Sequence, residues 1–191
     1  MRRLILFVGI ISSNCYTQNL PLAEAALERT YHTVRYDPSY VSIPYPNGDV
    51  PADTGVCTDV VIRSFRKLGI DLQKEVHEDI SSNFQAYPSK RIWGLLRPDK
   101  NIDHRRVPNL QTFFHRKGMS IPITDKPSDY LPGDIITWML PGNLPHIGIV
   151  SPKPSKNTDR FLIAHNIGAG PVLEDILFSY TITGHYRLNL E

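Results

Sequence analysis

Residues 55–69 show the clearest helical pattern of the chain. The small and apolar residues of one helical face recur there at spacings of three and four: Cys57, Val60, Val61, Ser64, Phe65 and Leu68. Gly69 is placed to end such a helix, and Asp53 or Thr54 to cap its start. The pattern therefore predicts an amphipathic helix that carries Cys57 in its first turn, on the side that faces the core.

Less regular segments lie on both sides of this helix. Residues 21–31 predict a second amphipathic helix, with Pro21 at its first position. Residues 71–80 are expected to continue as a helix or a loop. Residues 81–102 have little periodicity and predict a long connection, of the kind that is often functional or mobile in compact domains.

A further helix is predicted over residues 110–118. Its apolar stripe consists of Leu110, Phe113 and Phe114, and Gly118 is placed to end it. Either Asn109 or Asp103 could cap its start.

After Pro132 the pattern changes to that of β-strands. Apolar and β-branched runs separated by Pro-Gly and Gly-rich turns cover residues 134–140, 146–150 and 160–166, and a closing strand is predicted near residues 184–188. Residues 151–159 are predicted to be a loop. Helices followed by a meandering antiparallel sheet indicate an α+β fold.

The composition narrows the classes of function. The chain has 191 residues and a formal net charge of +2, which suits one domain, expected over residues 20–191, and argues against nucleic acid as a partner. The cluster His77-Glu78-Asp79 lacks a metal-ligand spacing, and no phosphate loop or nucleotide fingerprint occurs. We therefore expect a monomer that needs neither a cofactor nor a metal.

The N-terminus differs from the rest of the chain. Residues 1–17 contain a basic start, an apolar run and a small polar segment, which predicts a secretory signal peptide and a periplasmic or secreted protein. Cys15 lies where a lipoprotein cysteine would be, so membrane attachment is expected only if Cys15 is lipidated. A buried N-terminal strand is the alternative. Removal of the signal after Cys15 would leave Cys57 as a lone cysteine, which favours a reactive thiol.

Cys57 is the first candidate for chemistry. Unpaired N–H groups and the positive end of the helix dipole favour a thiolate, so this position predicts a lowered thiol pKa. A thiolate is the form that attacks carbonyl groups. Free cysteine is also among the most buried residue types, so a small buried hydrophobe remains the alternative.

A thiol nucleophile needs a base, and the base needs an orienting group. His146 opens one predicted strand and His165 closes the next. If these strands pair as a meander, the start of one lies beside the end of the other, and the two histidines meet. Packing the predicted helix against this sheet would bring Cys57 to the same cleft.

Four stretches carry a resemblance to known proteins: residues 55–60, 101–110, 132–135 and 164–171. A cysteine at a helix start followed by Pro-Gly-Asp-Ile, His-Ile-Gly-Ile-Val and Phe-Leu-Ile-Ala-His strands resembles the NlpC/P60 cysteine peptidases of the papain-like superfamily. Over about residues 30–190 the chain resembles more closely the bacterial DUF1287 family, a group of unknown function. The resemblance implies a papain-like fold with Cys57 as nucleophile, His146 as general base and His165 as its orienting group.

The chain departs from the NlpC/P60 pattern at the nucleophile, where Val56-Cys57-Thr58-Asp59 stands in place of Asp-Cys-Ser-Gly. The substrate is therefore not implied by the resemblance. Candidates for substrate binding are Asp59, His104, Arg105, Arg106 and Asn166. Paired arginines can bind a carboxylate, and a surface ion-pair cluster is the alternative.

Together these features predict an extracytoplasmic cysteine hydrolase, a peptidase or amidase that acts on cell-wall peptide or related amide bonds. Its expected partner is peptidoglycan or a peptide substrate. The alternative is a non-catalytic cell-wall or peptide-binding module on the same fold. Hydrolysis and acyl transfer share an acyl-enzyme, and the sequence does not separate them.

Overall fold

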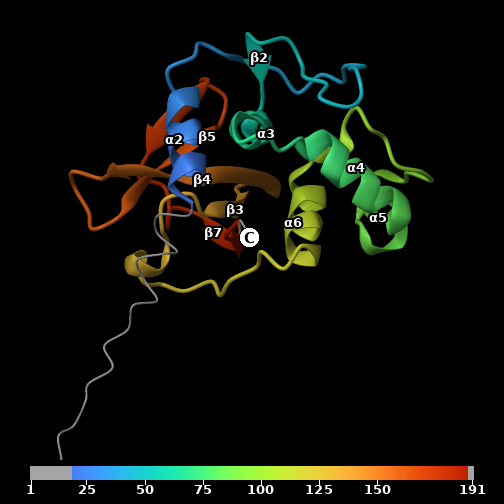
Figure 1. The fold of residues 1–191 in the computed structure, drawn as a ribbon. Helices are drawn as coiled ribbons and strands as arrows, with labels where there is room; N and C mark the ends of the chain where they lie inside the picture. Colours follow the sequence, from blue (N-terminus) through green and yellow to red (C-terminus); the bar gives the residue numbers. More distant parts are fainter. Residues whose placement is uncertain (1–18, 189–191) are drawn as a thin grey trace, which may run out of the picture.

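The computed structural model describes residues 19–188 and contains helices and one larger sheet (Figure 1). The helices are α2 (Leu20–Arg29), α3 (Cys57–Lys67), α4 (Leu72–Ser82), α5 (Ser89–Trp93) and α6 (Val107–Arg116). The strands are β1 (Arg35–Tyr36), β2 (Thr54–Gly55), β3 (Ile135–Leu140), β4 (Leu144–Pro154), β5 (Phe161–Asn166), β6 (Pro171–Glu174) and β7 (Thr181–Tyr186). The predicted signal peptide and Cys15 lie outside the described residues.

The larger sheet has the strand order β6-β5-β4-β3-β7, and every neighbouring pair is antiparallel. Helices α2 and α3 pack against β4 and β5 (Figure 1). Strands β1 and β2 form a separate parallel pair, and β2 ends directly before Val56, the N-cap of α3. The predicted α+β class and the antiparallel meander are thus confirmed.

Strand alternation divides the core into two apolar clusters. Ile147 and Ile149 of β4 face the helices, in a cluster that also contains Cys57. Trp138 and Val150 belong to a second cluster on the opposite face of the sheet. Because side chains alternate along a strand, His146 points to the same face as Val150.

The starts of helices α3 and α6 differ from the predicted ones. Helix α3 begins at Cys57 with Val56 as its N-cap, and Asp59 inside the first turn accepts the N–H of Val56 at 2.7 Å. The expected caps Asp53 and Thr54 were therefore wrong, because a carboxylate within the helix bonds back to the N-cap N–H. Helix α6 begins at Val107, three residues early, with Arg106 as its N-cap in place of Asn109 or Asp103.

Two other segments are more regular than predicted. The expected connection over residues 81–102 contains the short helix α5, which Gly94 ends in a left-handed conformation with φ of 66°. Strand β4 continues through Pro154, where a loop was predicted from residue 151. No helix in the described part of the chain is long and apolar enough to cross a membrane.

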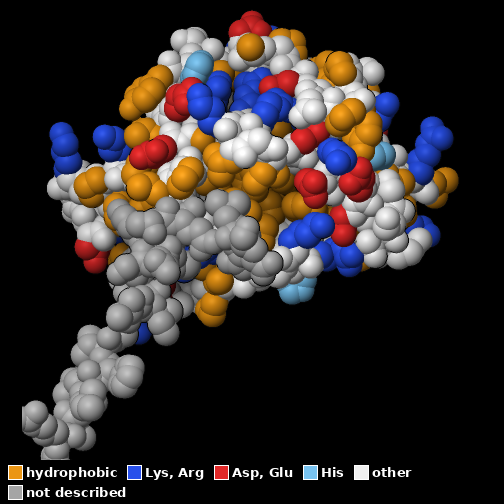
Figure 2. Space-filling model, viewed as in Figure 1, with side chains coloured by type: hydrophobic (Ala, Val, Ile, Leu, Met, Phe, Trp, Pro, Cys, Tyr) orange, Lys and Arg blue, Asp and Glu red, His pale blue; other side chains and the backbone are white. Residues whose placement is uncertain are grey.

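Apolar side chains gather at the centre of the face shown in Figure 2, near the junction of α3, α4 and α6. A groove of about 390 Å³ lies among these helices, lined by Phe65, Leu72, Phe113 and Met119 among others. Phe65 is near the end of α3, whereas Cys57 begins it, and eight residues of helix span about 12 Å. This groove is therefore distinct from the surroundings of Cys57.

Candidate functional site

Cys57 is the first residue of α3, and its side chain is only 7% exposed. Burial raises the pKa of its thiol to about 12, although the N–H groups of Ile147, Thr58 and Cys57 itself favour the thiolate. The predicted lowering of this pKa was therefore wrong. The helix start does supply N–H groups, but removing the sulfur from water outweighs them.

The N–H of Ile147 in β4 lies close enough to the thiol of Cys57 to favour its ionised form. Val150 donates its N–H to Asp134 on the β3 side of β4, and N–H directions alternate along an antiparallel strand. The N–H of Ile147 therefore points to the β5 side, where it interacts with the sulfur. His165 and Asn166 are the last two residues of β5, so Cys57 lies beside the end of that strand.

The two predicted histidines meet in the folded chain. Nε2 of His146 and Nδ1 of His165 are 3.1 Å apart, and their rings are nearly perpendicular. The strands place them together, since Gly148 of β4 is the register partner of His165. Trp138, the cross-strand partner of His146, lies with its ring centroid 5.8 Å from that of His146. The predicted contact between the two histidines is confirmed.

Both imidazoles are held neutral. Burial, together with the smaller effect of repulsion by a protonated His165, lowers the pKa of His146 to about 3. Burial also lowers the pKa of His165, against the opposing effect of Glu174. Within the described residues, the thiol makes no hydrogen bond to either ring. Catalytic hydrogen bonds are often long in free enzymes and shorten when substrate binds.

Glu174 is the residue of this cluster that the sequence did not identify. Its carboxylate lies 3.0 Å from Nε2 of His165, at the end of β6. The segment from residue 174 onward had no clear period, so only the pairing of β5 with β6 reveals the contact.

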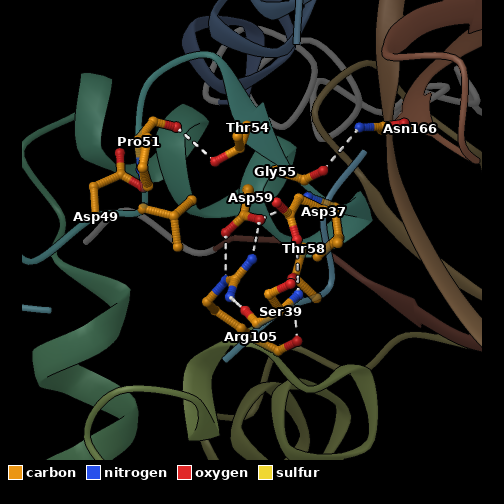
Figure 3. Close-up of polar contacts among 12 residues, drawn as sticks. Asp37, Ser39, Asp49, Pro51, Thr54, Gly55, Thr58, Asp59, Arg105 and Asn166 are labelled. Atoms are coloured by element: carbon orange, nitrogen blue, oxygen red, sulfur yellow. Dashed lines mark hydrogen bonds and ion pairs between the residues drawn. The ribbon is translucent and has the colours of Figure 1, made fainter. Parts of the chain in front are cut away.

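Asp59 and Arg105 form a buried ion pair below the start of α3 (Figure 3). Nε of Arg105 donates to one carboxylate oxygen of Asp59 at 2.9 Å, and Nη2 donates to the other at 2.8 Å. Thr58 also donates its hydroxyl to the carbonyl of Arg105 at 3.2 Å. These contacts tie the helix of Cys57 to the 3₁₀ turn Asp103–Arg105, so Asp59 and Arg105 bind each other in the free protein.

The other candidate binding residues have different surroundings. Asn166 donates to the carbonyl of Gly55 at 3.4 Å (Figure 3). It also accepts from the N–H of Gly168. Arg106 lies 4.1 Å from the ring centroid of Trp93, and its guanidinium is 3.4 Å from Asp103. Arg106 is therefore the candidate whose guanidinium remains partly available at the surface.

A groove of about 840 Å³ passes over Cys57. It is lined by residues of the β1 region, α5, α6 and the β3–β4 turn, including Tyr36, Trp93, Arg91, Arg105, Arg106, Met139 and Pro145. Its lining includes three arginines, and the described lining residues include no carboxylate. The groove thus combines apolar walls with positive charge beside the thiol.

His104 lies outside this groove and is almost completely buried, at 2% exposure. Burial lowers the pKa of His104 to about 4, although Asp59 acts in the opposite direction. His104 and His146 must therefore be neutral in the folded protein near pH 7.

We expect the protein to lose stability as the pH falls from 7 to 5. A histidine whose pKa is lower in the folded state than the usual 6.5 contributes stability above pH 6.5, and this contribution is lost as the pH falls towards the folded value. For His104 this loss is about 2 kcal/mol at pH 5. Urea unfolding at both pH values measures it.

The matched variants are His104→Gln and, on the exposed end of α6, His115→Gln. The loss between pH 7 and 5 is expected to shrink by about 2 kcal/mol in His104→Gln and to stay unchanged in His115→Gln. An equal loss in wild type and His104→Gln would contradict the burial of a neutral imidazole at this position.

Comparison with known proteins gives a family without an activity. The family described as Domain of unknown function (DUF1287) matches residues 23–188. The chain is similar to a protein of Escherichia coli (strain K12) named "Uncharacterized protein YijF", with 52% identity over 169 residues, which is 88% of this chain and 81% of that protein. No solved structure matches the chain.

Proposed function

The chain belongs to the DUF1287 family, and from the geometry of its site we propose that it is a cysteine hydrolase, a peptidase or amidase acting on cell-wall peptide or related amide bonds. One observation carries this proposal. The N–H of Ile147, the residue directly after His146, favours the thiolate of Cys57, and the ring of His146 is hydrogen-bonded to that of His165. The thiol lies on the helix side of the sheet, next to the residue that follows the base, and we propose that the thiol and the ring of His146 meet when substrate binds.

The proposed reaction starts from neutral groups. Nε2 of His146 is engaged with His165, so Nδ1 is the nitrogen that takes the proton of Cys57 as the sulfur attacks the carbonyl carbon. The backbone N–H of Cys57 at the start of α3 stabilises the oxyanion. The imidazolium then protonates the leaving amine, which leaves an acyl-enzyme.

Water completes the turnover. His146 takes a proton from the water, which attacks the thioester, and returns that proton to the departing sulfur. The products are an amine and a carboxylic acid, and the thiol is regenerated. An amine in place of water would give acyl transfer by the same steps.

The groove supports a peptide with a free carboxylate as substrate. Arg105 is paired with Asp59, so Arg91 and Arg106 are the guanidinium groups that such a carboxylate would meet. Trp93 and Met139 supply apolar walls on either side. Cell-wall stem peptides have this chemistry, and a location outside the cytoplasm follows from the proposed signal at residues 1–17.

We also propose that the fold is of the papain-like NlpC/P60 type. In its support, the cysteine begins a helix, and a Pro-Gly-Asp turn, a strand with His146 and a strand with His165 follow in that order. The direct test of function is digestion of purified peptidoglycan, with the released fragments and their new termini identified by mass spectrometry.

The second candidate function is a binding module for peptide or cell wall. The burial of Cys57 and the rise of its pKa to about 12 favour it, because a buried neutral thiol is chemically inert. On that reading the same groove would bind a peptide without turnover.

Thiol labelling separates the two functions. At pH 7 we expect a small neutral alkylating reagent to label Cys57 slowly, and faster as the pH rises, because the raised pKa keeps the thiolate scarce. If His146 acts as the base, His146→Ala slows labelling by about tenfold or more. Exposed His32→Ala is the matched control. Equal labelling rates in wild type and His146→Ala would favour the binding module.

A further inference from the structure

Glu174 completes a line of hydrogen-bonding groups that begins at His146. The line runs from Nε2 of His146 to Nδ1 of His165 at 3.1 Å, and from Nε2 of His165 to the carboxylate of Glu174 at 3.0 Å. Three adjacent strands, β4, β5 and β6, supply one member each. His165 is fully buried, whereas the side chain of Glu174 is 49% exposed.

The hydrogen-bonding capacity of each group determines which ring nitrogens of the two histidines carry a proton. An ionised carboxylate only accepts, so Nε2 of His165 must donate to Glu174. In a neutral His165, Nδ1 then carries no proton and accepts from Nε2–H of His146. Nδ1 of a neutral His146 is consequently left with a lone pair, and a lone pair is what a base for the thiol needs.

From this geometry we infer that Glu174 is a positioning residue, which sets the tautomers of both histidines so that Nδ1 of His146 is free to accept the thiol proton. Its catalytic part rests on the proposed function, whereas its effect on the tautomers does not. Glu174 touches neither the thiol nor the groove lining, so it acts only through His165.

The same line stabilises the charge that forms during the reaction. When the proton of Cys57 moves to Nδ1 of His146, the imidazolium is bonded through Nε2–H to His165, and His165 is bonded to a carboxylate. Among the described residues, the charged group that acts on the pair is Glu174 from β6. Loss of the negative charge at Glu174 therefore makes protonation of His146 less favourable.

Nitrogen-15 NMR of the imidazoles tests the tautomers without any substrate. In wild type at pH 7 we expect both His146 and His165 to be protonated at Nε2. Glu174→Ala should release His165 from this single tautomer, whereas Glu174→Gln, whose amide oxygen still accepts, should largely keep it. Glu78→Gln in α4, at 57% side-chain exposure, is the matched control and should change neither ring.

Protonation of His165 at Nδ1 in wild type, or identical tautomers in wild type and Glu174→Ala, would overturn the inference. If the wild type is active, its kinetics provide a second test. Glu174→Ala is expected to lower kcat about tenfold, and Glu174→Gln is expected to shift the acid limb of the kcat/KM profile to lower pH. Unchanged kcat and pH profile in both variants would also overturn it. A wild type without hydrolase activity would instead reject the proposed function, and the NMR result would still decide the role of Glu174.

Discussion

Replacing Cys57 by alanine is expected to abolish the release of fragments from peptidoglycan, with a loss in rate of about 10⁴-fold or more. The proposed reaction forms a bond between the sulfur and the carbonyl carbon, and no other described cysteine can replace it. Mass spectrometry of the digest, with wild type and variant at equal concentration, measures the loss. His146→Ala is expected to show a loss of similar size, because groups that act as one unit are not additive.

For this test, the loss of activity must come from the missing thiol and not from unfolding of the variant. Cys57 is buried, but alanine removes only the sulfur atom, so a cost in the free energy of unfolding of about 1 kcal/mol is expected. Cys15→Ala is the matched cysteine control and should keep full activity. Fragment release by a folded Cys57→Ala variant at the wild-type rate would reject the cysteine mechanism.

The parts of the fold that depend on local pattern were predictable. The apolar face from Cys57 to Leu68 predicted α3, and Gly69 indeed adopts the left-handed conformation, with φ of 80°. The alternation of apolar residues after Pro132 predicted the central strands in their antiparallel order. The short helix α5 escaped prediction because five residues give too little periodicity to recognise.

Some features of the candidate site were likewise predictable from the sequence, and others were not. The contact between His146 and His165 followed from a meander, in which consecutive strands are neighbours. The thiol pKa did not follow, because the helix start is visible in the sequence whereas the burial of the sulfur against Ile147 depends on the packed sheet. Glu174 and the pairing of Arg105 with Asp59 are likewise products of tertiary structure.

The ion pair between Asp59 and Arg105 is expected to contribute the largest effect on stability. Both side chains are 3% exposed, so Asp59→Ala would leave a guanidinium buried without its partner. Breaking such a pair costs about 3–5 kcal/mol in the free energy of unfolding, and urea unfolding at pH 7 measures it. The exposed pair of Lys67 with Glu28 is the control, and Glu28→Gln should change the free energy of unfolding far less than Asp59→Ala.

Removing both charges distinguishes a buried unpaired charge from a general loss of packing. Asp59→Leu combined with Arg105→Met should recover most of the stability lost in Asp59→Ala, because apolar side chains of similar size need no partner. About 1 kcal/mol should stay lost, since Asp59 also accepts the N–H of Val56 at the start of α3. A double variant no more stable than Asp59→Ala would show that the cost lies in packing around Cys57. Recovery would show that the cost of Asp59→Ala comes from the guanidinium of Arg105 that is left buried without its partner.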